Sequence, residues 1–350
     1  MFVALRDLRF AKGRFALMVA VIVMVAFLVG FLAALTSGLA RESTSAITEL
    51  PADRIAFSTP EGAAADFTSS TVSAQQVKAW ADLDSVRSAE PLGVATTRIS
   101  ADGQTVAATA MGVEAGSALV PTAVPAEGQV VLSKGLADKL LGVRVLEIGG
   151  RSYEVAAVAD TELSFAHTPV LWMSLSDWRA IGLADSSSSD IATVVAITGD
   201  SAKSVPQMTA MTPSESRTAI GSFSSENGSL LTITGFLVAI SALVVSAFFS
   251  VWTVNRTADI AVLKALGASG SYLVRDAIGQ AALVLVGSVA VGTALAWLAA
   301  LVAGSFLPVV AGATTLLVPG VILILAGLVG AAGAVWRITR IDPHAALAAR

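Results

Sequence analysis

Phenyl rings and carboxylates along one predicted helix near the N-terminus are the side chains best suited to bind a ligand. These positions, at intervals of three or four residues, are Phe27, Phe31, Leu35, Gly38, Glu42, Ser45 and Glu49. A helix places residues with this spacing on one face. Phenyl rings next to carboxylates would suit a flat amphiphile such as haem, and Met24 would add a soft thioether contact.

Glu49 is the leading candidate for a haem-iron ligand, because it lies further along the chain from the lipid headgroups than Glu42. We expect Glu42 to pair with Arg41 or with lipid. In a symmetric dimer, one such carboxylate would supply a ligand from each side of the haem. The competing interpretation is that this stripe packs against the second membrane span and that Glu42 and Glu49 are only solvated.

Other catalytic or metal-binding chemistry finds little support in the sequence. The chain has no cysteine, which excludes disulfides, thiol catalysis and cysteine-bound metal. It has no glycine-rich loop followed by Lys and Ser or Thr, which is the usual phosphate cradle for ATP, so we expect that it is no enzyme and cannot energise transport by itself. Its two histidines are His167 and His344, and we interpret His167 as a loop or hydrogen-bonded histidine rather than a ligand.

The composition places the chain in a membrane. Of its 350 residues, 55% are hydrophobic and 14% are charged, and the mean hydropathy is +0.75. The net charge of −4 offers no surplus of cations for a phosphate backbone, so a nucleic-acid partner is not expected.

Uncharged stretches locate the membrane spans. There are 26 uncharged residues between Arg14 and Arg41, and 29 between Glu226 and Arg256. Each stretch exceeds the roughly 20 helical residues that cross a bilayer. A third stretch of 60 uncharged residues, 277–336, is too long for one span and must fold back at Pro308, Gly312, Pro319 and Gly320.

We therefore predict an α-helical membrane protein with four transmembrane helices and a mixed α/β extracytoplasmic domain inserted between helices one and two. The predicted segments are a cytoplasmic amphipathic helix (1–14), the first span (15–40), the outer domain with its stalk (41–228), the second span (229–254), a cytoplasmic segment (255–275), the third span (276–304), a short outer loop (305–318), the fourth span (319–337) and a cytoplasmic tail (338–350). Rows of small residues such as Ser288, Gly292 and Ala296 predict close packing of these spans.

Cations near the spans set the orientation. Lys and Arg outnumber Asp and Glu before span one, after span two and after span four. Because such cations favour the cytoplasmic side of the cell membrane, both termini are predicted to be cytoplasmic and residues 41–228 extracytoplasmic. A cleavable signal peptide is the alternative for span one, but its apolar run is longer than a signal-peptide core.

The outer segment is expected to mix helices and strands. Ser73 and Ser133 are predicted helix caps, and strands are predicted within 92–99, 105–113, 129–132, 169–173 and 191–197. A hairpin is predicted around Gly149 and Gly150. The Ser-rich segment 186–189 is predicted to be a loop, and the Ser, Asn and Gly run at 221–229 a linker.

The segment after span two predicts an amphipathic helix, which could lie at the lipid interface or dock on a partner. Here the sequence resembles the MacB/FtsX-type permeases, the membrane subunits of a class of ABC transporters. The resemblance rests on Arg256, Asp259 and Ile260 with the run Leu263 to Ala268, on the entry residues Leu5 to Arg14, on Val130 to Leu140 and on Arg340 to Leu347. Asp259 stands where the family usually has Glu.

This resemblance implies a homodimeric permease that works with two copies of a separate ABC ATPase by mechanotransmission. The residues it assigns to coupling with the ATPase are Arg256, Asp259, Leu263, Lys264, Leu266 and Gly267. The compact four-span form resembles the haem-exporter branch of the family, which implies efflux of haem or another lipophilic small molecule. The alternatives are an FtsX-like envelope regulator that activates cell-wall hydrolases, or an exporter of antibiotics, peptides or lipoproteins.

Overall fold

The computed structural model describes residues 12–59, 63–122, 124–182, 190–199, 205–255 and 269–339. The chain divides into two compact units. One contains Met1–Gly38 with Gly228–Arg350, and the other contains Leu39–Asn227. Each unit is described separately below.

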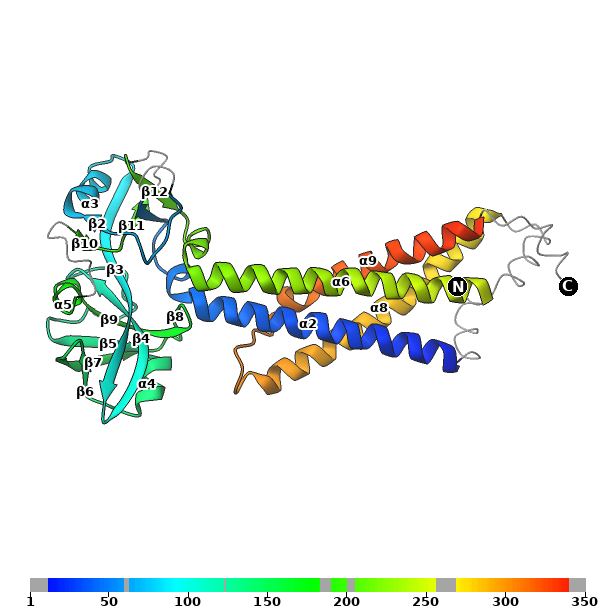
Figure 1. Ribbon diagram of the computed structural model, residues 1–350, viewed down its shortest axis with the longest axis horizontal. Helices are drawn as coiled ribbons and strands as arrows, with labels where there is room; N and C mark the ends of the chain where they lie inside the picture. Colours follow the sequence, from blue (N-terminus) through cyan, green and yellow to red (C-terminus); the bar gives the residue numbers. More distant parts are fainter. Residues whose placement is uncertain are drawn as a thin grey trace. The chain divides into compact units, whose positions relative to one another are not determined.

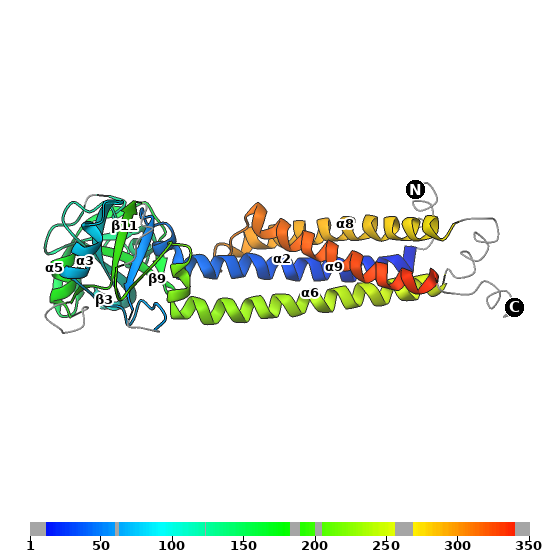
Figure 2. The same ribbon diagram turned by 90° about the horizontal axis from the view of Figure 1, so that it is seen from above.

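Four long helices form the membrane-spanning unit. They are α2 (Lys12–Thr48), α6 (Gly221–Asn255), α8 (Gly270–Ala303) and α9 (Ala313–Thr339), of which α2 and α6 each have one end in the outer unit. Each contains an apolar stretch of at least 21 residues, enough to cross a bilayer. Side chains from all four helices share one apolar cluster that includes Ile22, Phe249, Leu285 and Leu323. Figures 1 and 2 show α8 and α9 folding back on one another. The prediction of four transmembrane helices is therefore confirmed.

Small residues let these helices approach closely. A Cβ added at Gly30 of α2 would lie 3.0 Å from the Cβ of Ala296 in α8, and one added at Gly330 of α9 would lie 2.8 Å from the carbonyl oxygen of Ala242 in α6. Gly38 faces the backbone of Pro308, where a Cβ would lie 1.8 Å from the carbonyl oxygen. The predicted rows of small residues thus serve packing within one chain.

The fourth membrane helix is predicted to begin at Pro319, because proline is a helix breaker. This start is wrong. Helix α9 starts six residues earlier, at Ala313, and includes Pro319. Proline removes only one main-chain hydrogen bond here, the one its missing N–H would donate to Thr315. A helix packed within a bundle tolerates that loss.

The outer unit is built around a mixed ten-stranded sheet with short helices, which confirms the predicted α/β class. Its strands run in the order β12-β1-β11-β3-β4-β9-β5-β7-β6, with β8 paired to β9, and β10 pairs with β2 in a separate sheet. The strands are β1 (Arg54–Ser58), β2 (Val72–Ser73), β3 (Val86–Ala101), β4 (Gln104–Val113), β5 (Gln129–Ser133), β6 (Val145–Ile148), β7 (Arg151–Ala159), β8 (Ser164–Phe165), β9 (Thr168–Ser174), β10 (Asp190–Ala192), β11 (Val194–Gly199) and β12 (Met208–Met211). The helices are α3 (Ala74–Ala81), α4 (Lys134–Leu140), α5 (Leu175–Ala180) and a 3₁₀ turn (Ser216–Ala219).

Two apolar cores lie on opposite sides of the sheet because successive side chains of a strand point in opposite directions. On β5, Val130 and Leu132 join the core that contains α3, α4 and α5, whereas Val131 joins the other core. That second core receives Ile47 from the end of α2 and Phe223 from the start of α6. Ser73 caps α3 as predicted, whereas Ser133 precedes α4 without a side-chain capping bond.

Residues 221–229 form the first turns of α6, so their prediction as a linker is wrong. Two contacts explain the difference. Phe223 is buried in the outer core, and the Ser222 hydroxyl lies 3.2 Å from the Ser43 hydroxyl. Tertiary packing overrides the weak helix propensity of Ser, Asn and Gly.

Candidate functional site

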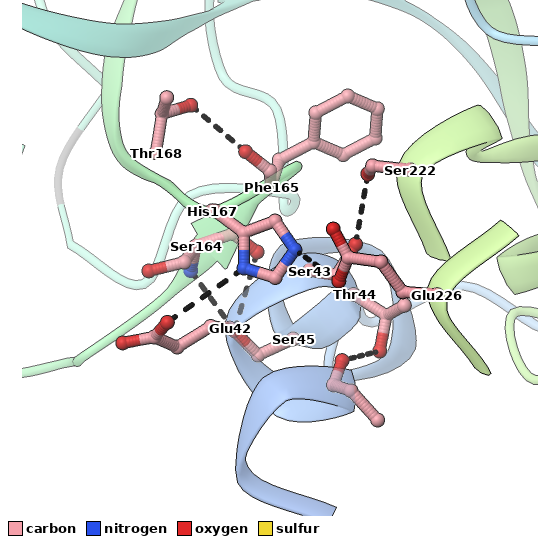
Figure 3. A network of polar contacts seen from close by, with 11 residues as sticks. Glu42, Ser43, Thr44, Ser45, Ser164, Phe165, His167, Thr168, Ser222 and Glu226 are labelled. Atoms are coloured by element: carbon pink, nitrogen blue, oxygen red, sulfur yellow. Dashed lines mark hydrogen bonds and ion pairs between the residues drawn. The ribbon is translucent and has the colours of Figure 1, made fainter. Parts of the chain in front are cut away.

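The outer end of α2 is the part of the predicted ligand stripe that lies in the outer unit. Figure 3 shows its polar surroundings. Ser43, Thr44 and Ser45 are all buried, and each hydroxyl has a partner. The Ser45 hydroxyl accepts the Ser164 N–H at 2.9 Å and lies 3.3 Å from the Ser164 carbonyl oxygen. The hairpin β8–β9 is therefore bonded to the last turns of α2.

The turn of that hairpin has an unusual amino-acid composition. Ala166 and His167 both have left-handed backbones, with φ of 48° and 63°, and they form the complete two-residue connection between β8 and β9. In the described ranges, the other two-residue hairpins have Asp102-Gly103 and Gly149-Gly150 at these positions, as expected for turns that need positive φ. A left-handed conformation costs about 1 to 2 kcal/mol for a residue with a side chain.

Contacts with α2 and α6 offset this strain. The Ala166 N–H donates to the Ser43 carbonyl at 2.9 Å, and the His167 N–H donates to the Glu42 carbonyl at 3.3 Å. The His167 ring reaches both helices. Its Nε2 lies 2.9 Å from Glu226 Oε2, and its Nδ1 lies 3.7 Å from Glu42 Oε2. A doubly protonated ring can donate towards both carboxylates, whereas either neutral tautomer donates from one nitrogen.

The two carboxylates predicted to face a ligand have different partners. Glu42 faces His167, and its side chain is 48% exposed. Glu49 follows the end of α2 at Thr48 and forms an ion pair with Arg41 at 3.3 Å. Of the two partners expected for Glu42, Arg41 is thus wrong, and pairing with lipid stays a prediction. His167, which is distant in sequence, is the partner of Glu42. Glu49 continues the path of α2, since its N–H donates to the Ser45 carbonyl at 3.0 Å, and the long Arg41 side chain reaches it there.

The apolar members of the stripe lie in the membrane-spanning unit. Phe27 and Phe31 are stacked with their ring centroids 6.0 Å apart, and both pack against the cluster of Ala34, Ala296, Ala300 and Leu316. The alternative interpretation expected this stripe to pack against span two. Phe27 and Phe31 instead contact α8 and α9, so that expectation is wrong for these two residues. Met24 is 61% exposed within this unit.

The structure does not test three further sets of predicted residues. The coupling residues Arg256, Asp259, Leu263, Lys264, Leu266 and Gly267 lie outside the described residues. So do most of the predicted N-terminal helix and the Ser186–Ser189 loop. Within the described ranges, no group of three or more His, Asp or Glu side chains could hold a metal ion. Glu42 and Glu226 approach opposite nitrogens of His167 and do not converge on one point.

The sequence predicted a hydrogen-bonded loop histidine at position 167 but not its partners. The only local signal is an Ala-His pair between two β-prone segments, where Asn or Gly would be usual. The contacts of His167 with residues 42 and 226 join chain segments that are far apart in sequence. A periodic pattern of apolar residues within one segment cannot predict such contacts.

Comparison with known proteins supplies the family. Residues 15–213 match the model of the MacB-like periplasmic core domain, and residues 231–343 match that of the FtsX-like permease C-terminal region. Two relatives, from Staphylococcus haemolyticus and Staphylococcus epidermidis, are both described as putative hemin transport system permease protein HrtB. Each is 23% identical, and each match covers 98% of this chain and 98% of the relative.

Solved structures of outer domains show weaker similarity. The periplasmic region of MacB from Actinobacillus actinomycetemcomitans is 9% identical with a TM-score of 0.34, covering 50% of this chain and 95% of that one. The extracellular domain of the transporter YknZ from Gram-positive bacteria is 15% identical with a TM-score of 0.33, covering 42% and 83%. The assignment rests on the family models, which together span both units: the chain is a multi-pass membrane protein that belongs to the MacB/FtsX-type family of ABC transporter permeases.

Proposed function

We propose that this chain is the permease subunit of an ABC-type exporter that removes an amphiphilic small molecule from the membrane, with haem as the leading substrate. The observation that carries the proposal is the match, over 98% of the chain, to permeases described as hemin transport proteins. In this proposal two copies of the chain form a homodimer with two copies of a separate ATPase, which supplies the ATP hydrolysis. Both termini are cytoplasmic and residues 41–228 are extracytoplasmic.

Mechanotransmission is the mode of action that fits the spans. The three membrane stretches of 26, 29 and 60 residues contain no charged side chain. Transporters that carry a polar substrate through the bilayer centre commonly place ionisable residues there. An uncharged bundle that transmits ATP-driven motion to an outer domain needs no such residues.

Glu49 remains the proposed ligand to haem iron. Its side chain is 49% exposed, and its partner Arg41 is 58% exposed. An exposed ion pair of this kind contributes at most about 1 kcal/mol, so release of Glu49 from Arg41 would be inexpensive. Glu42 is a weaker candidate because its carboxylate faces His167. Phe31 lies 18 residues before Glu49, which is roughly 27 Å along a helix, so Phe27, Phe31 and Met24 are not proposed to contact a haem bound at Glu49.

Haem titration of the purified dimer in lipid nanodiscs tests this proposal. The haem absorption band should change in Glu49→Ala and remain unchanged in Glu147→Ala, a matched control at an exposed position of β6. Identical spectra and affinities in the wild type and both variants would reject Glu49 as the ligand. Absence of haem binding in the wild type, with ATP-dependent transport of another amphiphile, would reject haem as the substrate.

A further inference from the structure

We propose that His167 is a positioning residue that fastens the outer end of α2 and the first turns of α6 to the sheet of the outer unit, so that the three elements move together. We call this junction the His167 clamp, and define it by Glu42, Ser43, His167, Ser222 and Glu226. Its role in transport rests on the proposed function, whereas its mechanical role rests on the contacts alone.

The first argument is the comparison of turns within the chain. Two of the three two-residue hairpins in the described part of the chain have glycine at one or both positive-φ positions, and only the β8–β9 turn has side chains at both. Strained residues persist where the surrounding structure needs them. Here the Cβ of Ala166 packs on the outer core, and the His167 imidazole reaches Glu42 and Glu226. Glycine at these two positions would relieve the strain and lose both contacts.

The second argument is that the hairpin is fixed firmly to the sheet. Phe165, the residue before the turn, is 6% exposed and meets Phe67 edge to face with centroids 5.1 Å apart. Phe67 in turn meets Phe57 of β1 at 4.8 Å. The Thr168 hydroxyl donates to the Phe165 carbonyl and lies 2.6 Å from the Thr109 hydroxyl on β4. A force on the His167 ring is therefore transmitted to the packed core of the sheet.

The third argument is that His167 links two helices. At the ends of α2 and α6, the hydroxyls of Ser43 and Ser222 lie 3.2 Å apart. The imidazole adds a bridge through Glu42 and Glu226 (Figure 3). Both helices continue along the chain into candidate membrane spans. The clamp thus lies where motion of either span would reach the outer domain.

Hydrogen–deuterium exchange of the full chain in nanodiscs tests the clamp without transport. His167→Asn retains a residue that tolerates positive φ but cannot reach both carboxylates. Amide exchange in residues 42–48 and 221–227 should rise about tenfold in this variant, as expected for loss of one charge-assisted contact. Asp102→Asn, in the β3–β4 turn, is the matched control and should leave this exchange unchanged. Glu226→Gln should have a larger effect than Glu42→Gln, because Glu226 is the nearer partner.

A reversible cross-link tests the role in transport. The chain has no cysteine, so Ser43→Cys with Ser222→Cys introduces the only pair that could form a disulfide. In the His167→Asn background, ATP-dependent transport should fall, return when the disulfide forms, and fall again on reduction. Thr59→Cys with Thr209→Cys, whose native hydroxyls lie 2.8 Å apart between the end of β1 and β12, should not restore it.

The outcomes separate the two proposals. Unchanged exchange in His167→Asn would overturn the clamp. Raised exchange with full transport would overturn the role of the clamp in transport, as would a disulfide formed between positions 43 and 222 that leaves transport lost. Absence of ATP-dependent transport in the wild-type chain with its ATPase would instead overturn the proposed function, while the exchange measurement would still decide whether the clamp exists.

Discussion

Gly292 of α8 lies directly against Ala26 of α2, so closely that a Cβ at position 292 would be 2.6 Å from the Ala26 Cβ. The backbone of α2 surrounds the same point, with the Val23 carbonyl oxygen at 2.6 Å and the Phe27 nitrogen at 3.0 Å. Backbone atoms cannot rotate away as a side chain can. The contact between these helices therefore requires glycine at position 292.

Gly292→Val should cost about 2 kcal/mol or more through overpacking and should lower the temperature at which the detergent-solubilised protein loses its monodisperse state. Gly279→Val is the control on the same helix, because a Cβ at Gly279 has no neighbour within 4 Å. Equal thermal stability of the two variants would show that α8 does not pack on α2 at this point.

Gly93 of β3 packs directly against the buried indole of Trp178. A Cβ at position 93 would lie 2.5 Å from the ring, so Gly93→Ala should destabilise the outer unit by about 2 kcal/mol or more. Denaturant unfolding followed by tryptophan fluorescence measures this change. Gly135→Ala, within α4 and without a neighbour within 4 Å, should instead be neutral or stabilising. A midpoint for Gly93→Ala equal to that of the wild type would contradict the packing.

Glu215 contributes a pH-dependent stability. The backbone N–H and the hydroxyl of Thr212 both donate to its carboxylate at 2.9 Å, and these bonds lower its pKa from the ordinary value of 4.5. A lowered folded-state pKa means that the contribution is complete above pH 4.5 and is lost as the pH falls through the folded-state pKa. Glu215→Gln should therefore unfold earlier than the wild type at pH 7, with the difference closing in acid. Thermal unfolding at neutral and at acidic pH measures it, and a constant difference would refute it.

The predicted orientation can be tested by cysteine labelling. Residue 187 should lie on the extracytoplasmic side of the cell membrane and residue 264 on the cytoplasmic side. A membrane-impermeant thiol reagent applied to intact cells should label Ser187→Cys and not Lys264→Cys, and permeabilised cells should label both. The reverse pattern in intact cells would invert the topology.

The predicted coupling segment can be tested through Leu263 and Leu266. Replacing both by Asp places charges on the apolar stripe and should abolish transport and the stimulation of the partner ATPase, while membrane insertion remains intact. Thr257→Asp, outside the stripe, serves as the control. Normal stimulated ATPase activity in the double variant would contradict docking of this segment on the ATPase.

The sequence by itself determined the membrane spans and the mixed α/β class of the insert. A span depends on about 20 consecutive apolar residues, and this local property survives any choice of packing partner. The strands around Val130 and Leu171 were likewise visible, because each is a short run of consecutive apolar residues rich in strand formers, which is a local property. The close packing that small residues such as Gly292 allow was also legible from their spacing.

Tertiary structure decided the partners of the polar residues and the limits of two helices. The spacing of Glu42 and Glu49 placed them on a helix face, but a face does not specify what meets it. His167 reaches Glu42 because a hairpin more than a hundred residues later folds onto α2. Residues 221–229 become helical because Phe223 and Glu226 find partners on the outer unit, which a low local helix propensity cannot show. Contacts between distant segments gain their energy only after the chain has folded, so the sequence pattern of either segment alone contains no record of them.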